Sequence, residues 1–178
     1  VPPQAQAINM LCEGKTHFAL ASFAQKSCLD AEFVEFLCDP VVLITPLDHP
    51  WAKKKVIEIK DLHDVNFILR EEDSGTYHTV RDALLNTNIR IERLKKLLTL
   101  GNSEAIALSV QNGLGVGFVS HAVATGMGQN RVAIVKISGL DICRDIYIGR
   151  HPRLPATKAQ NAFWDFVTSI APIKNTYI

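Results

Sequence analysis

Two hydrophobic patterns alternate along the chain. Short runs of consecutive apolar residues predict buried strands, and segments in which apolar residues recur every three or four positions predict helices. The expected strands are 18–21, 33–47 with a kink at Asp39-Pro40, 66–69, 90–100, 113–119, 131–137 and 142–148. The expected helices are 5–13, a short one near 61–62, one that begins at 74–76, 105–112, and a last one that Pro155 opens.

The same pattern predicts which faces are buried. Residues 18–21 are almost all apolar, as expected of a strand covered on both faces, and 105–112 is apolar enough to be nearly buried. In the last helix we expect one buried side formed by Ala159, Phe163, Phe166, Val167 and Ile170.

Strands that alternate with helices indicate an α/β fold with largely parallel sheets. The chain opens on a helix, and a sheet domain rarely begins with a crossover helix, so we expect the first strand to precede Val1. The short strands and helices in the middle of the chain suggest one lobe inserted into another.

Composition narrows the class of protein. The chain has 178 residues, 47% of them apolar, with 19 Lys and Arg against 18 Asp and Glu, which indicates a globular protein and excludes disorder. This near-neutral charge argues against a nucleic-acid binder. The basic run at 53–55 is explained by a solvated turn.

The cysteines and the apolar runs bear on cell compartment. Cys12, Cys28, Cys38 and Cys143 are too widely spaced for a zinc knuckle or a redox pair, so we expect reduced thiols packed as small hydrophobes. No run is long enough to cross a bilayer, and no export signal is visible, which favours the cytoplasm and no membrane partner.

Signatures of enzymes are weak, and we predict no catalytic residue, no metal and no cofactor. The six histidines form no metal-ligand spacing. The glycines of 113–117 resemble a dinucleotide loop but follow a helix instead of a strand, the reverse of the required order. The acidic run 71–73 is explained by the dipole of the helix that follows it.

Hydroxyl-rich residues stand at two helix starts and at two other strand ends. Ser74-Gly75-Thr76 and Asn102-Ser103 each follow a strand, and Ser22 and Ser120 end strands. Ligands of open α/β sheets gather at such edges, and helix N-termini favour anions. The alternative is ordinary helix capping, which is commoner for any single site. Gly75 favours a ligand because glycine in a first helical turn suggests a close backbone approach.

Several segments, in order, resemble a known family. Residues 11–22 resemble its "L-x-x-G-x-x-D-x-A-L" motif, with His17 in place of Asp, and 42–51 resemble its crossover strand and "HP" turn. Residues 68–76 are similar to its strand and "SGT" helix start, and 113–119 to its "G-x-G-I/V-x-x-x-P" element, with Ser120 in place of Pro. The chain thus resembles the effector-binding domain of LysR-type transcriptional regulators, from Pro3 to about Ile170.

The resemblance implies a fold and a function. The fold is α/β, with two Rossmann-like lobes of mixed, mainly parallel sheet in the type 2 periplasmic-binding-protein architecture, and without the N-terminal strand or strands of lobe one. Lobe one is expected at 1–46 with 144–178, and lobe two at 47–143. A small effector, an organic or inorganic anion, would bind between the lobes and alter DNA binding by a winged helix-turn-helix that is absent from this chain.

Carried over by position, the resemblance also implies site residues and partners. The expected effector-binding residues are Ser22, Phe23, Ser74, Gly75, Thr76, Gly101, Asn102, Ser103 and Ser120. The protein is expected to form a homodimer or homotetramer, and the exposed strand 33–37 is one candidate contact. The alternative is a solute-binding protein of a transport system with the same fold. An enzyme ranks third, because no nucleophile, base and orienting group occur together.

Overall fold

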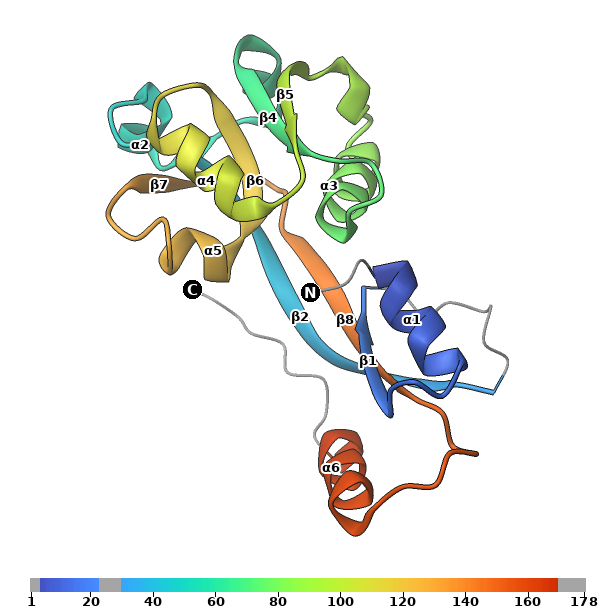
Figure 1. Cartoon of the computed structure of the whole chain (residues 1–178). Helices are drawn as coiled ribbons and strands as arrows, with labels where there is room; N and C mark the ends of the chain where they lie inside the picture. Colours follow the sequence, from blue (N-terminus) through green and yellow to red (C-terminus); the bar gives the residue numbers. More distant parts are fainter. Residues whose placement is uncertain (1–3, 23–29, 170–178) are drawn as a thin grey trace. The chain divides into compact units, whose positions relative to one another are not determined.

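The structure is a computed structural model of the chain and describes residues 4–22 and 30–169 (Figure 1). The chain divides into two compact units. Unit 1 comprises the described residues of 1–39 and 145–178, and unit 2 comprises residues 40–144. Strands β2 (Glu32–Pro46) and β8 (Ile142–Arg150) contribute to both units. No helix of the described part is long and apolar enough to span a membrane.

Unit 1 places a small sheet between two helices. Strand β1 (Phe18–Ala21) pairs antiparallel with β8. Helix α1 (Gln4–Cys12) packs against β1 through its buried Ile8 and Leu11. Helix α6 (Lys158–Ser169) packs through Trp164 and Val167 against the apolar cluster that includes Ile148.

Two burial predictions for unit 1 are only partly right. In β1 the alternate residues Ala19 and Ala21 are buried, but Leu20 is 55% exposed, so one face of the strand is only partly covered. In α6 the buried residues are Trp164 and the predicted Val167, whereas Phe166 is 61% exposed, and Ile170 lies outside the described residues. The helix begins at Lys158, after the predicted start at Pro155, because a loop follows β8 and Thr157 and Gln160 form reciprocal capping bonds.

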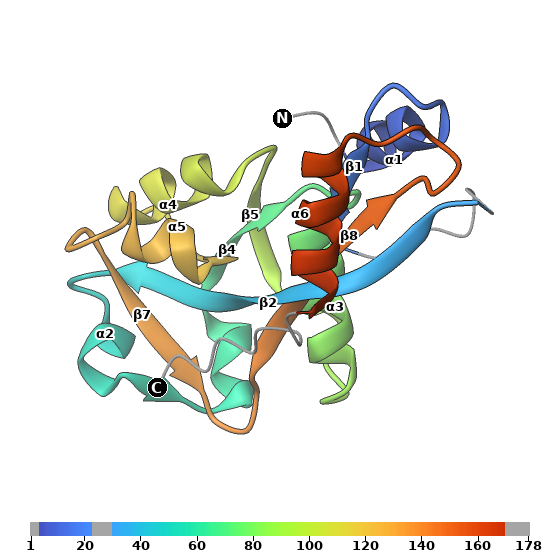
Figure 2. The same ribbon diagram turned by 90° about the horizontal axis from the view of Figure 1, so that it is seen from below.

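Unit 2 is built on a mixed sheet with strand order β2-β6-β4-β5. Strands β4 (Asn66–Arg70), β5 (Lys95–Leu100) and β6 (Val116–Ser120) are mutually parallel, and β2 runs antiparallel to β6. Strand β7 (Val132–Ile137) joins β2 antiparallel and the short β3 (Val56–Ile57) in parallel. Figure 2 shows the long β2 with β7 beside it.

Both faces of this sheet are covered, which explains its apolar strands. Phe67 and Leu69 point into a cluster with residues of helix α3 (Gly75–Leu85), whereas Ile68 packs with helix α4 (Ser103–Gln111) on the opposite face. Short elements complete the unit: α2 (Pro50–Lys54), the 3₁₀ turns η1 (Ile59–Asp64) and η2 (Ile91–Arg93), and α5 (His121–Thr125). The segment 90–100 was predicted as one strand, but its first part forms η2 and strand β5 begins only at Lys95.

The prediction that α4 is nearly buried is also only half right. Ile106, Ala107 and Val110 face the sheet and are buried, but Leu108 is 57% exposed.

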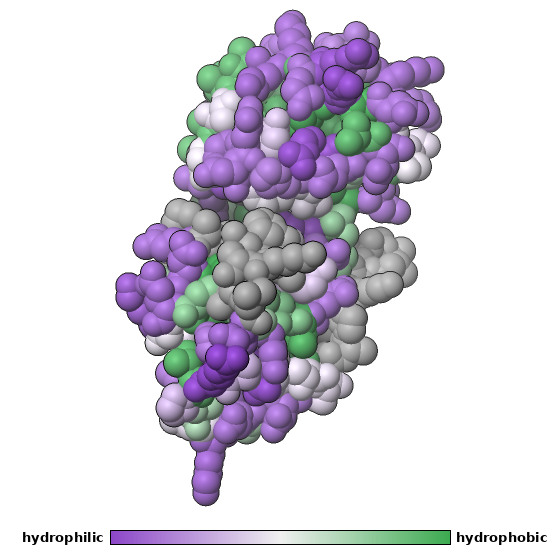
Figure 3. Space-filling view, turned by 90° about the vertical axis from the view of Figure 1, so that its right-hand side faces the viewer, coloured by the Kyte–Doolittle hydropathy of each residue, from purple (hydrophilic) through white to green (hydrophobic). Residues whose placement is uncertain are grey.

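The face shown in Figure 3 is mostly hydrophilic, with smaller hydrophobic patches.

The prediction of reduced thiols is wrong for two cysteines. Cys38 on β2 and Cys143 on β8 are disulfide-bonded, whereas Cys12 is not part of a disulfide. Sequence spacing missed this because disulfide bonds depend on distance in space, which residues far apart in the sequence can meet. Cys28 lies outside the described residues.

The disulfide-bonded state of Cys38 and Cys143 predicts which cysteines iodoacetamide can modify. Iodoacetamide added to the folded, unreduced protein and followed by denaturation should modify Cys12 but neither Cys38 nor Cys143. After treatment with dithiothreitol in denaturant, all three should be modified. Peptide mass spectrometry measures each site, and alkylation of Cys38 or Cys143 before reduction would contradict the structure.

Candidate functional site

The topology of unit 2 brings three predicted site segments to one edge of the sheet. Strands β5, β4 and β6 are parallel, so their C-terminal ends lie at the same edge. Arg70 and Leu100 are paired in register, which places the segment after β4 beside the segment after β5. Helices α3 and α4 begin there, and Ser120 ends β6 at the same edge.

Three of the predicted side chains cap helices. Ser74 Oγ accepts a hydrogen bond from the backbone N–H of Tyr77 at 3.0 Å, and Asn102 Oδ1 accepts one from Ala105 at 2.6 Å. Ser120 Oγ accepts one from Val123 at 3.3 Å. These three side chains therefore act as helix caps, although each serine keeps an O–H that can donate to a ligand.

Two arginines that the sequence analysis did not select lie at this edge. Arg144 Nη1 donates to Thr76 Oγ1 at 3.2 Å, and the Thr76 side chain is buried. Arg70 donates to Ser103 Oγ and to the Gly101 carbonyl, both at 3.2 Å, and so ties the end of β4 to the start of α4. The only signal for Arg70 in the sequence is a basic residue at the end of an apolar strand.

Glu71 has a partner in addition to the role that the sequence predicted. Both carboxylate oxygens of Glu71 accept hydrogen bonds from Arg70, at 2.6 and 2.7 Å, and the first turn of α3 contains no acidic residue. Glu71 lies before the N-cap residue Ser74, as predicted, and its partner Arg70 is what the sequence did not indicate. The hydrogen bonds from Arg70 hold the pKa of Glu71 below its ordinary value.

The Arg70–Glu71 pair predicts how the free energy of unfolding changes at acid pH. Because the folded-state pKa of Glu71 is lowered, its contribution to stability is present above the ordinary pKa and is lost as the pH falls through the folded value. Arg70→Met should move the pKa of Glu71 upward and flatten the fall in unfolding free energy at acid pH. Carboxyl NMR titration and urea unfolding at several pH values measure this. Arg81→Met, which breaks the exposed pair with Asp82, should leave the titration of Glu71 unchanged.

The remaining predicted residues are placed as follows. Gly101 and Asn102 are exposed, Gly75 and Ser103 are half-buried, and a β-carbon built on Gly101 would meet no atom within 4 Å. The hollow beside Arg70 and Thr76 holds only about 10 Å³, room for about one water molecule. Ser22 belongs to unit 1, directly after β1, and Phe23 lies outside the described residues.

The glycines of 113–117 are explained by packing. Gly113 has φ +77°, just after the end of α4, and a β-carbon on Gly115 would lie 2.5 Å from the Asn66 carbonyl oxygen. The order of helix, glycines and strand also stands as predicted. In the described ranges, no group of three or more His, Cys, Asp or Glu side chains could hold a metal.

Curated relatives of this chain are transcriptional regulators. It is 33% identical over 133 residues to an HTH-type transcriptional regulator of Methanocaldococcus jannaschii, which covers 74% of this chain and 45% of that protein. It is 37% identical over 130 residues to a probable RuBisCO transcriptional regulator of Cyanidioschyzon merolae, which covers 72% of this chain and 43% of that protein. The chain thus spans less than half the length of these relatives.

Solved structures share the fold. The CcmR regulatory domain of Synechocystis, in complex with 2-PG, has a TM-score of 0.80 and 25% identity over 99% of this chain and 82% of that one. The effector-binding domain of QuiR, in complex with shikimate, has a TM-score of 0.76 and 21% identity over 93% of this chain and 77% of that one. The predicted mixed α/β fold of the type 2 periplasmic-binding architecture is confirmed.

These relatives decide between the functional alternatives left by the sequence. They are transcriptional regulators and neither transport proteins nor enzymes. The prediction that this chain is the effector-binding domain of a regulator is therefore confirmed. The family model of the LysR substrate binding domain matches residues 2–171, and this chain therefore belongs to the LysR substrate-binding domain family, the effector-binding part of LysR-type transcriptional regulators.

Proposed function

We propose that this chain senses a small anionic metabolite, which binds at the edge of unit 2 where α3 and α4 begin. The observation that carries the proposal is the convergence of three parallel strand ends on that edge, each followed by a helix start. Backbone N–H groups and helix dipoles there favour a negative charge. The segments are those predicted from the sequence: Ser74 to Thr76, Gly101 to Ser103, and Ser120.

Fixed positive charge supports an anion over a neutral ligand. Arg144 at Thr76 and Arg70 at Ser103 stand at the two helix starts, and Arg70 is also paired with the carboxylate of Glu71. An arginine presents several donors in a plane that matches a carboxylate or phosphate group. A small carboxylic or phosphorylated metabolite therefore suits this edge.

The regulatory output is proposed to lie outside this chain. We infer that the bound effector alters DNA binding by a winged helix-turn-helix, that the protein works as a homodimer or homotetramer, and that it acts in the cytoplasm. Coupling requires the effector to bind one state of the protein better than the other, since equal affinity shifts no equilibrium. The transcriptional-regulator relatives support this output.

A substitution at Gly101 tests the site. The space around its missing side chain is open, so Gly101→Leu should fold normally yet occupy the ligand's position between the two helix starts. In a thermal-shift screen of small carboxylates and phosphates, the ligands that stabilise the natural chain should lose at least about tenfold in affinity for Gly101→Leu. Gly101→Ala is the matched control and should bind nearly normally. Equal affinity for all three proteins would disprove the site.

A further inference from the structure

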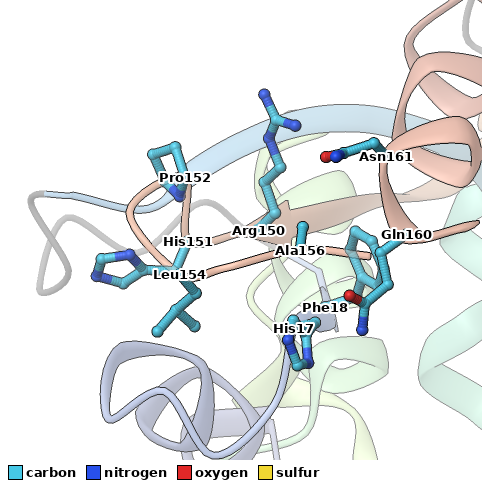
Figure 4. A pocket seen from close by; sticks show the side chains of 9 residues that line it. All are labelled: His17, Phe18, Arg150, His151, Pro152, Leu154, Ala156, Gln160 and Asn161. Carbon is cyan, nitrogen blue, oxygen red and sulfur yellow. The ribbon is translucent and has the colours of Figure 1, made fainter. Parts of the chain in front are cut away.

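A second pocket, in unit 1, shares no lining residue with the proposed effector site. It measures about 240 Å³ and is lined by the ends of β1 and β8, the loop after β8 and the first turn of α6. Its lining residues are His17, Phe18, Arg150, His151, Pro152, Leu154, Ala156, Gln160 and Asn161 (Figure 4). This volume is below the range of drug-sized ligand sites and suits a small metabolite.

The polar part of the lining can donate several hydrogen bonds to a bound anion, and its one arginine is also ion-paired with Glu32. No acidic side chain lines the pocket, whereas Arg150, two imidazoles and two amides do. Arg150 is held in place by the Trp164 ring, 4.4 Å from its guanidinium carbon, and by a bond from Nε to Glu32 at 3.0 Å. Among the described residues, its two terminal nitrogens are left for another acceptor. In Figure 4 the guanidinium and the Asn161 amide lie on the same side of the loop.

The rest of the lining is apolar or unsatisfied. Phe18, Leu154 and Ala156 offer a surface for a hydrocarbon group. Nδ1 of His151 is buried and has no hydrogen-bond partner in the described part of the chain, a state that a bound polar group would relieve. The His17 Nε2 atom is already engaged by the Pro155 carbonyl at 3.2 Å, which fixes the ring at the rim.

We propose that this pocket is a second ligand site, for a small organic carboxylate with an apolar tail. The carboxylate accepts hydrogen bonds from Arg150 and Asn161, and the tail packs against Phe18, Leu154 and Ala156. This pocket shares no residue with the proposed effector site, so a substitution in one site leaves the lining of the other unchanged.

The chain has a built-in reporter for this site. It contains two tryptophans, Trp51 in unit 2 and Trp164 under Arg150, so Trp51→Phe leaves a single emitter beside the pocket. Phenylacetate is the probe. Phenylacetamide is the control for shape without charge, and inorganic phosphate is the control for charge without a tail. We expect a saturable change in Trp164 emission with phenylacetate, and at least about tenfold weaker binding of either control.

Variants locate the binding. Arg150→Met keeps an unbranched side chain but removes the guanidinium, and it should weaken phenylacetate binding at least about tenfold. Ala156→Leu, on an exposed loop position, should fill the pocket and do the same. Gly101→Leu should leave this signal unchanged, which separates the inference from the proposed function. Circular dichroism verifies that each variant is folded. An absent signal, equal binding of phenylacetamide, or unchanged affinity in folded Arg150→Met and Ala156→Leu would overturn the proposal.

Discussion

Phe67→Ala is expected to lower the unfolding free energy of unit 2 by about 3–5 kcal/mol, the cost of removing a buried phenylalanine and leaving a cavity. Phe67 is completely buried in the middle strand β4. Its ring stacks on that of Phe118 with a centroid distance of 5.8 Å, so the substitution removes a partner from the centre of the larger apolar cluster. A loss of this size is comparable to the whole stability of many domains.

Urea unfolding followed by tryptophan emission measures the loss, since Trp51 belongs to the same cluster as Phe67. Leu97→Ala in the neighbouring strand β5 is the matched control. That side chain is 47% exposed, and its truncation should cost less than about 1 kcal/mol. A small effect at Phe67 would show that the β4 face towards α3 is not the core of the unit.

Gly117→Ala is the second substitution with a large expected effect. A β-carbon at this position would lie 2.6 Å from Cγ2 of Ile106 and 3.0 Å from the backbone oxygen of Ile68. Gly117 lies in β6, between β2 and β4, and α4 packs directly on it. Either the helix or the sheet must move, and overpacking of this kind costs about 1–3 kcal/mol.

A double-mutant cycle identifies the contact responsible. Ile106→Leu moves the branch of the side chain away from the β-carbon and removes Cγ2, so the two substitutions together should cost less than the sum of their separate effects. Urea unfolding of the four proteins gives the coupling free energy. Gly101→Ala, whose added β-carbon meets nothing within 4 Å, is the control for glycine replacement. Strict additivity would mean that α4 does not approach the sheet through Ile106.

The elements that local sequence predicts well are those with a clear period or a clear stop. The strands at Phe18–Ala21 and Glu32–Pro46 and the helix start at Ser74 were all predicted, because apolar runs and capping residues act within a few positions. The exposed Leu20, Leu108 and Phe166 were not. Burial of a face depends on which element packs there, and periodicity does not encode that.

The residues of the candidate site also differ in whether the sequence predicts them. Its serines and its asparagine stand out in the sequence because hydroxyl and amide groups directly follow strands. Arg70 and Arg144 do not, since each becomes relevant only through a partner distant in sequence, Ser103 and Thr76 respectively. The sequence does not predict the pocket of unit 1 either, because its walls come from β1, β8 and α6, which are distant from one another in the sequence.

By itself, the sequence determined the alternation of strands and helices, the helix caps and the membership of the LysR family. Each of these is written in neighbouring residues, through hydrophobic period, capping chemistry and short motifs in a fixed order. Only the tertiary structure decided the strand order β2-β6-β4-β5, the disulfide-bonded state of Cys38 and Cys143, and the arginines that stand at the helix starts. The physical reason is that hydrogen-bonded pairing, disulfide bonding and charge placement depend on distances in space, which local sequence patterns do not specify.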